Sequence, residues 1–492
     1  MAPPVKDTAA PSPLLSLSAV DLRDRLASGA VRAVDYVEAC LAQIALREPD
    51  VQAWEWLDGD FARAQARALD ARRQSGAVLG PLHGLPVGLK DIIDTKGIPT
   101  QNGTVIDEGR VPTADAFVVA RLRAAGAIIM GKTVCTEVAY LHPSKTRNPH
   151  HPGHTPGGSS SGSAAAVAAG MVPLAVGTQT GGSVIRPAAY CGVVGFKPSF
   201  GLISRGGVLM QSPTLDTMGV FGRSVEDVAL LAEVLAGHDV ADPATQAMPV
   251  PRLLATAMAR APVPPMFALV RLPDQALADD QVQGAMDELA DLLGDQCFGT
   301  ILPNAFDEAA GIRQRINYAE MAKCYYGLER RGRAQMSPIL AQAMDQGKAT
   351  LARDYIAALD WRDLLNAGLD QIFDRCDVIL TPSTPTPAPE GLQSTGSAIF
   401  NGLWTLCGTP AVTLPLFWAE NGLPMGVQLI GRRGDDARLL RTARWLATHI
   451  ETLSNGETAA GSIVWWLISH SWCWRGSWAS FCGSCRGLTL AS

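Results

Sequence analysis

Hydrophobic positions along the chain follow two spacings, and these distinguish predicted helices from predicted strands. Over residues 34–44 apolar side chains recur every three or four positions, which indicates an amphipathic helix that ends before Pro49. Helices are also predicted over residues 61–72, 116–125, 281–293 and 355–373. Short apolar runs predict strands within residues 85–94, 127–130, 377–385, 410–416 and 426–431.

The alternation of helices with short apolar strands predicts the fold class, a layered α/β domain. We expect this domain to cover residues 14–460, after a flexible N-terminal arm at residues 1–13. Residues 240–375 are mostly amphipathic helical sequence and are predicted to form a cap or insertion. No internal repeat accompanies this pattern.

The last residues, 461–492, break the pattern. They contain no Asp or Glu, five of the 11 tryptophans and three of the ten cysteines, without amphipathic spacing. One hypothesis is a non-native extension, and the alternative is a hydrophobic docking tail. Cys482 and Cys485 form a single CxxC pair with no second pair, so a zinc site is not expected.

Composition excludes several classes of function. The 492 residues include 41 basic and 47 acidic side chains, a net charge of −6, so neither a nucleic-acid footprint nor a polybasic membrane anchor is present. No apolar run reaches the roughly 18 residues that a membrane-spanning helix needs. Because the start lacks a signal-peptide pattern and cysteines are sparse, we expect a cytoplasmic protein with reduced thiols.

Glycine is enriched, at 48 residues or roughly one in ten against about 7% on average. Six of these glycines lie in two short runs. The first, Thr155–Ser163 (TPGGSSSGS), leads into an alanine-rich helix whose first turn offers free N–H groups, although such a run alone is also typical of a linker. The second, Gly177–Pro187 (GTQTGGSVIRP), places paired glycines before Ser183, where successive N–H groups can converge as in an oxyanion hole.

Lys90 interrupts the apolar strand LPVGLKDIID at residues 85–94. An edge-strand lysine that reaches water would explain it, and so would a buried general base. Neutralising an ordinary lysine at pH 7 costs roughly 4.6 kcal/mol, and burial removes much of that cost by penalising the charged form. Asp91 need not oppose this, because neighbouring side chains on a strand point to opposite faces.

Lys90, GGSSSGSAAA and TGGS, with Ser183 24 residues after Ser159, together resemble the amidase signature family of serine hydrolases. The resemblance covers about residues 14–450. It implies an α/β/α fold with a central mixed sheet. Further similar stretches are GLPVGLKDIID (84–94), GKTVCTEVAY (131–140), GFKPSFGLISRGG (195–207), LDTMGVFGRSVEDVALL (215–231) and GLPMGVQLIG (422–431).

The resemblance also implies the catalytic residues. Ser183 corresponds to the nucleophile, Ser159 to a bridging serine after a cis peptide bond, and Lys90 to the final base. Lys90 would take the proton of Ser159, which takes that of Ser183. The oxyanion hole would consist of the N–H groups of Thr180, Gly181, Gly182 and Ser183. This chemistry needs no cofactor and no metal.

Two positions depart from the family pattern. Gln179 stands where the family usually has Asp, and Arg186 follows the nucleophile by three residues where the family Arg commonly follows by two. Our hypothesis is that an Asp–Arg ion pair beside the nucleophile has become a neutral amide arrangement. The proton relay is not affected by either change.

Two other patterns point to different chemistry. Residues 126–133 (GAIIMGKT) fit a phosphate-binding loop, but a helix is predicted before them and a strand within them, which argues against nucleotide binding. His142, His150, His151 and His154 crowd one segment without the regular spacing of metal ligands, so we expect exposed or loop-supporting imidazoles.

We therefore expect hydrolysis of linear amides. By family position Ala139 and Tyr140 approach the acyl or aryl part of the substrate, and residues 240–375 shape the mouth. This neutral pocket favours anilides, aryl amides or hydrophobic acyl amides over charged substrates. Carbamates (urethanes) and esters stay open, as does a homodimer. The alternative function is the A-type subunit of a tRNA-dependent amidotransferase.

Overall fold

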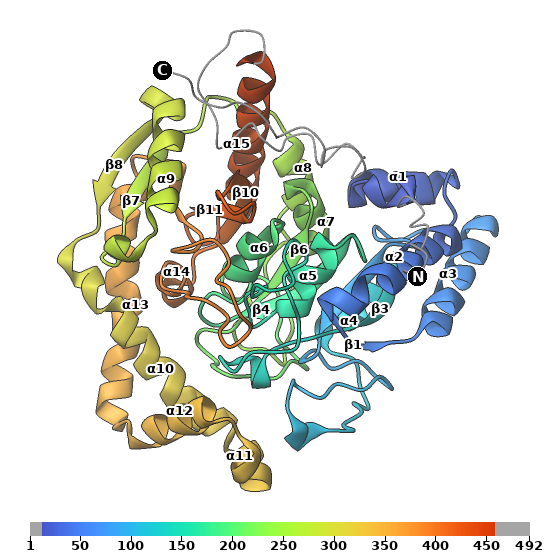
Figure 1. Ribbon diagram of the computed structural model, residues 1–492, viewed down its shortest axis with the longest axis horizontal. Helices are drawn as coiled ribbons and strands as arrows, with labels where there is room; N and C mark the ends of the chain where they lie inside the picture. Colours follow the sequence, from blue (N-terminus) through green and yellow to red (C-terminus); the bar gives the residue numbers. More distant parts are fainter. Residues whose placement is uncertain (1–11, 458–492) are drawn as a thin grey trace, which may run out of the picture.

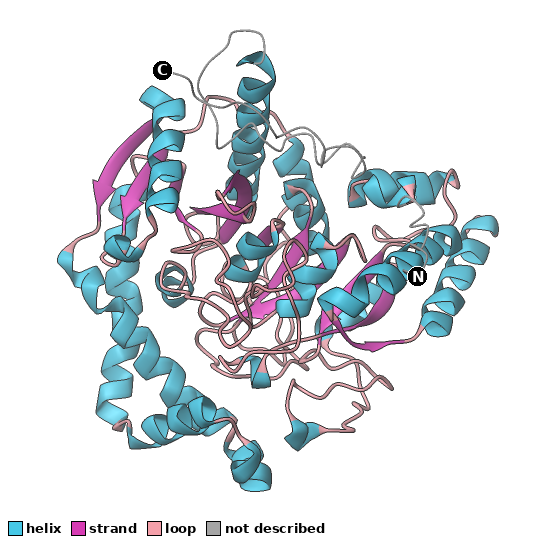
Figure 2. Ribbon diagram, viewed as in Figure 1, coloured by secondary structure: helices cyan, strands magenta, loops and turns pink. Residues whose placement is uncertain are grey.

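The computed structural model describes residues 12–457, and the predicted tail at 461–492 and most of the predicted arm lie outside them. A single 11-stranded sheet crosses the middle of the molecule, with helices around it (Figure 2). Its spatial order is β1 (Trp54–Leu57), β3 (Ile128–Thr133), β2 (Pro86–Lys90), β4 (Leu174–Gln179), β6 (Thr217–Gly222), β5 (Val194–Lys197), β10 (Ala411–Trp418), β11 (Pro424–Ile430), β9 (Val378–Pro382), β7 (Phe267–Arg271) and β8 (Cys297–Ile301).

The sheet is mixed. β2 pairs in parallel with β3 and β4, and β7 pairs in parallel with β8 and β9, whereas the other neighbours are antiparallel. The predicted α/β fold class is confirmed. Its helices are α1 (Ala19–Ser28), α2 (Ala33–Val51), α3 (Gly59–Gln74), α4 (Phe117–Ala124), α5 (Ser161–Ala168), α6 (Ile185–Cys191), α7 (Val225–Leu235), α8 (Leu253–Met258), α9 (Asp280–Leu293), α10 (Ala309–Cys324), α11 (Tyr326–Gly332), α12 (Pro338–Ala349), α13 (Ala352–Phe373), α14 (Gly402–Cys407) and α15 (Asp436–Glu457).

Helices cover both faces of the sheet. On β6, Gly219 and Gly222 are an odd number of residues apart and so point to opposite faces. A side chain at Gly219 would meet Val184, directly before α6, whereas one at Gly222 would meet Asp227 and Val228 of α7. α6 and α7 therefore lie on opposite faces of the sheet, and α5, which begins within the first glycine run, contacts α6.

The segment 240–375 contains more than helices. β7 and β8 add two strands to the end of the sheet, while α10 to α13 extend away from it along one side of the molecule (Figure 1). In the described part of the chain no helix has an apolar stretch long enough to cross a bilayer.

One predicted helix end was wrong. Pro49 does not follow α2 but lies inside it, and the helix continues to Val51. Its end is set by Gln52, which is in the left-handed conformation and donates its N–H to the carbonyl of Glu48. The Glu48 carboxylate then accepts the N–H groups of Ala53 and Trp54, so local capping and not the proline decides where the chain turns.

Candidate active site

Lys90 is the last residue of β2, a strand buried between β3 and β4. Its side chain has no solvent exposure. The Nζ atom lies 2.6 Å from Oγ of Ser159 and 2.9 Å from Oγ1 of Thr178. Burial lowers the pKa of Lys90 to about 8, opposed by the nearby Cys135 and Asp216. About a tenth of the amine is therefore neutral at pH 7.

Asp91 does not interfere with this amine. Its backbone N–H donates to Thr133, and its carboxylate accepts the N–H of Gln101 at 3.0 Å, which turns it away from Lys90. The alternation of side chains along the strand therefore separates the two groups as expected.

Ser159 follows a cis peptide bond from Gly158 and lies just before α5. It is almost completely buried, and its carbonyl accepts the N–H of Thr136 at 3.2 Å. The Gly158 carbonyl accepts Nη2 of Arg186 at 2.6 Å. The peptide before Ser159 is thus held from the α6 side, while its hydroxyl faces Lys90.

Ser183 lies in the turn between β4 and α6, and 8% of its surface is exposed. Thr178, five residues earlier, contacts Lys90, and Arg186, three residues later, contacts the peptide before Ser159. The turn that carries Ser183 is therefore anchored to the Lys90–Ser159 pair on both sides. The Ser183 hydroxyl makes no hydrogen bond to any residue from 12 to 457, Ser159 included.

The predicted oxyanion loop offers free donors. Within the described residues, the N–H groups of Gly181, Gly182 and Ser183 have no acceptor. The neighbouring Thr180 donates its hydroxyl to Asp216 at 2.6 Å. This arrangement leaves three successive backbone donors beside the Ser183 hydroxyl, as binding of an oxyanion requires.

Asp216 supports this loop from behind and was not predicted from the sequence. Its second carboxylate oxygen accepts the N–H groups of Gln211 and Ser212. Burial raises the pKa of Asp216 to about 6, against the opposing effect of these hydrogen bonds. The only available signal was its place in the LDTMG stretch, which gives no indication of contact with Thr180.

Gln179 and Arg186 have separate partners. The Gln179 side-chain carbonyl accepts the N–H groups of Val184 and Ile185 at 2.9 and 3.0 Å, so it caps α6. Its amide nitrogen donates to Thr405. Arg186 donates to the carbonyls of Gly158 and Gly396, and burial lowers its pKa to about 10. Gln179 and Arg186 therefore share no partner, and the exchange of an ion pair for a neutral amide arrangement stays a hypothesis.

Ala139 and Tyr140 lie on a short turn, η3 (Glu137–Ala139), beside the buried pair. Thr136 links the turn to the site, because its N–H donates to Ser159 and its hydroxyl donates to the Tyr140 carbonyl at 2.6 Å. Ala139, Thr178, Thr180 and Asp216 line one small pocket. The Tyr140 hydroxyl is 3.0 Å from that of Tyr318 on α10, so residues of the 240–375 segment reach this side of the site.

The two competing patterns have structural roles. Lys132, of the sequence that resembles a phosphate-binding loop, lies inside strand β3 and is buried against the carbonyl of Ile93 and the hydroxyl of Thr100. His150 and His154 contact the carbonyls of Cys191 and Ala388. Among the residues that the structure describes, no group of His, Cys, Asp or Glu side chains could hold a metal ion.

Comparison with known proteins identifies the family to which this fold and candidate site belong. The sequence model of the family described as Amidase matches residues 35–440. The A-type subunit of the glutamyl-tRNA(Gln) amidotransferase of Chloroflexus aurantiacus is 36% identical over 85% of this chain and 93% of its own. A solved amidase is 30% identical, with a TM-score of 0.78 over 88% of this chain and 99% of its own. The peptide amidase of Stenotrophomonas maltophilia is 28% identical, with a TM-score of 0.77 over 89% and 97%. The chain belongs to the amidase signature family.

Proposed function

We propose that this protein hydrolyses linear amides through an acyl-enzyme formed on Ser183. The observation that carries the proposal is the 2.6 Å contact between the fully buried Lys90 amine and the Ser159 hydroxyl. A desolvated amine with a pKa of about 8 is a competent base for a hydroxyl in contact with it.

The relay needs one local movement. Neutral Lys90 takes the proton of Ser159, and Ser159 takes that of Ser183 once the partly exposed Ser183 hydroxyl rotates toward it. Ser183 then attacks the carbonyl, and the N–H groups of Gly181, Gly182, Ser183 and Thr180 hold the oxyanion. The returning proton goes to the leaving amine, and water hydrolyses the acyl-enzyme. This chemistry uses no cofactor or metal.

The substrates we propose are aryl amides and amides with hydrophobic acyl groups, with carbamates and esters as related substrates of the same oxyanion hole. The small pocket beside Thr180 and Asp216 also has apolar lining residues, among them Ile92, Ala139 and Met218, and these support the preference, as does the position of Tyr140. We place the reaction in the cytoplasm, with the described cysteines as free thiols. We also propose that the chain forms a homodimer.

Release of amine from matched anilide, aliphatic amide, carbamate and ester substrates tests the function, with Ser183→Ala as the blank. We expect release from the anilide and no release above the blank in the variant. Equal release by both proteins would overturn the proposal.

A second candidate is the A-type subunit of a tRNA-dependent amidotransferase, favoured by the 36% identity to one such protein. Gln179, in place of the usual Asp, speaks against it. This function requires partner proteins that accept ammonia. Ammonia transfer to an acyl-tRNA in the presence of such partners, without amide hydrolysis by the chain alone, would select it.

A further inference from the structure

Arg313 is a cation at the edge of the proposed active site. It lies on α10 (Ala309–Cys324), and its guanidinium passes between the oxyanion loop and the start of α14. A Cβ atom at Gly181 would stand 3.5 Å from Nη1 of Arg313, and one at Gly402 would stand 2.5 Å from Nε. The absence of a side chain at Gly402 leaves room for the guanidinium, and the distance at Gly181 is one of ordinary contact and places the guanidinium next to the loop.

Within the described residues Arg313 has neither a hydrogen bond nor an ion pair. Two buried arginines have partners: Arg186 donates to two carbonyls, and Arg205 pairs with Asp242 at 2.6 Å. Burial lowers the pKa of Arg313, and only the neighbouring Tyr318 and Tyr140 oppose this. Arg313 is half-buried, so its charge is partly removed from water without a partner inside the described protein, and a partner supplied by a ligand would be bound favourably.

We propose that Arg313 binds a carboxylate carried by the substrate, at a point beside the oxyanion loop. The inference rests on the proposed function and specifies its substrate class: amides or carbamates with a carboxylate near the scissile carbonyl. A planar guanidinium matches a carboxylate with two parallel hydrogen bonds. A single cation beside two tyrosines suits one negative charge better than a phosphate group, which recruits several donors.

With this proposal the substrate pocket contains a positive charge, whereas the sequence led us to expect an uncharged pocket. Arg313 is separated from Ser183 by 130 residues and lies in the segment with the least motif content. Nothing in its local sequence distinguishes it from Arg315, two residues later, which is exposed on the same helix. Only the packing of α10 against α14 brings Arg313 to Gly181.

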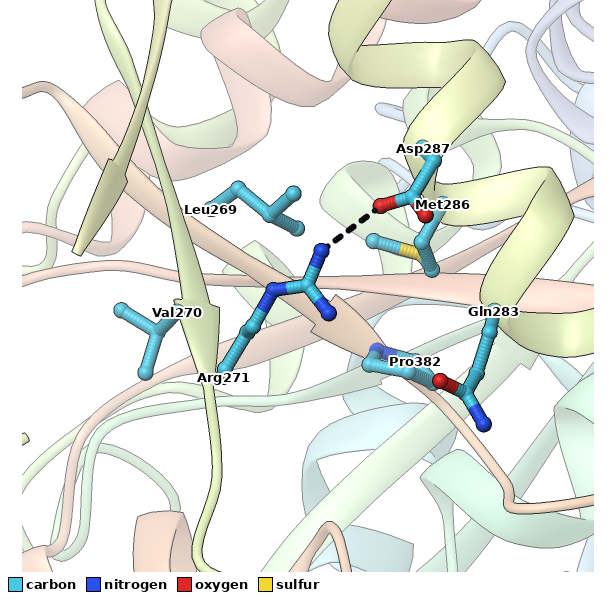
Figure 3. Close-up of a pocket in the computed structure, with 7 residues that line it drawn as sticks. All are labelled: Leu269, Val270, Arg271, Gln283, Met286, Asp287 and Pro382. Carbon is cyan, nitrogen blue, oxygen red and sulfur yellow. Dashed lines mark hydrogen bonds and ion pairs between the residues drawn. The ribbon is translucent and has the colours of Figure 1, made fainter. Parts of the chain in front are cut away.

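A second cavity, far from the oxyanion loop in the sequence, contains no unpaired charge among its described lining residues. Residues of β7, β9 and α9 line it, and its one arginine, Arg271, already pairs with Asp287 at 3.1 Å (Figure 3). Its charge is therefore satisfied inside the protein, in contrast to that of Arg313.

Two matched substrate pairs test the proposal. One carries the carboxylate on the acyl side, N-phenylsuccinamate against 4-methyl-N-phenylpentanamide. The other carries it on the amine side, 4-acetamidobenzoate against 4-isopropylacetanilide. We expect at least a tenfold preference in kcat/KM for the carboxylate in one pair, which also identifies the side that Arg313 contacts. Arg313→Gln should bring that ratio near one, Arg313→Lys should keep part of it, and Arg315→Gln should leave it unchanged.

Absence of a preference in both pairs, or equal losses on charged and neutral substrates in Arg313→Gln, would overturn the inference. Calorimetry with Ser183→Ala separates it from the proposed function. At least one of the two carboxylates should bind this variant, and adding Arg313→Gln should weaken that binding at least tenfold. If no amide is hydrolysed but this binding persists, the hydrolase proposal fails and the carboxylate site stands. Binding that is indifferent to Arg313 rejects the site.

Discussion

Two lysines on adjacent strands, Lys90 on β2 and Lys132 on β3, are both buried but have different partners, which suit the first to the proposed role of a base and the second to that of a structural cation. Both are fully buried, and burial lowers the pKa of both to about 8. Among residues 12–457, the Lys90 amine forms hydrogen bonds only with hydroxyls, those of Ser159 and Thr178. Lys132 contacts the carbonyl of Ile93, and Asp91 opposes the loss of its proton.

The difference lies in what each partner demands. A carbonyl oxygen can only accept, so it requires an N–H from the lysine and favours the ammonium. A serine hydroxyl can donate or accept, so it tolerates a neutral amine and can pass it a proton. Burial alone therefore does not identify a catalytic lysine, and the chemistry of its partners does.

Lys90→Met should have the largest effect. The substitution removes the base while keeping the length of an apolar side chain, so kcat for an anilide should fall about 10³-fold or more. The free energy of unfolding should fall by about 1 kcal/mol, because methionine fills the same buried space but the hydroxyls of Ser159 and Thr178 lose a hydrogen-bond partner. Steady-state kinetics measure the predicted change in kcat, and denaturant unfolding measures the change in the free energy of unfolding. Retained turnover would remove Lys90 from the mechanism.

Lys132→Met should give the opposite result. The Ile93 carbonyl and the Thr100 hydroxyl lose their buried donor, which should cost about 1–3 kcal/mol of unfolding free energy. The kcat of the folded protein should stay within about threefold, because Lys132 touches none of the proposed catalytic residues. A large loss of kcat in Lys132→Met with an unchanged free energy of unfolding would mean that Lys132 is not merely a structural cation.

The sequence offered candidates for the centre of the proposed site but not for its surroundings. Lys90, Ser159 and the TGGS turn were recognisable because each stands in a short motif whose local structure is decided nearby. Asp216 and Arg313 were not, since their roles depend on contacts with Thr180 and Gly181 that only the tertiary packing creates. The strands β7 and β8 were missed within residues 240–375 because short strands among amphipathic helices carry little periodicity of their own.

The pH dependence of activity tests the role of Lys90 further. Because the proposed base is the neutral amine, kcat/KM should rise with pH and level off above the Lys90 pKa of about 8. The Asp216 charge raises the pKa of Lys90, so Asp216→Asn should move the rise to lower pH. An asparagine can still accept the Thr180 hydroxyl, and Thr180→Val serves as the control for that contact. A rise that stays in place in Asp216→Asn would mean that this charge does not reach Lys90.

Gln179→Asp should have the smallest effect, and it tests whether the neutral arrangement beside Ser183 matters. An aspartate can still accept the N–H groups of Val184 and Ile185, where a negative charge also suits the N-terminus of α6. It loses the contact to Thr405, and Arg186 is already held by the carbonyls of Gly158 and Gly396. We therefore expect kcat to change less than about fivefold and the relative rates on anilide and aliphatic amide to shift by about twofold. Thr405→Val separates loss of the Thr405 contact from the new charge. If Gln179→Asp hydrolyses both substrates at the rates of the unmodified protein, the exchange is irrelevant to catalysis. A large loss of kcat would mean that Arg186 leaves its carbonyls to pair with the new carboxylate and disturbs the peptide before Ser159.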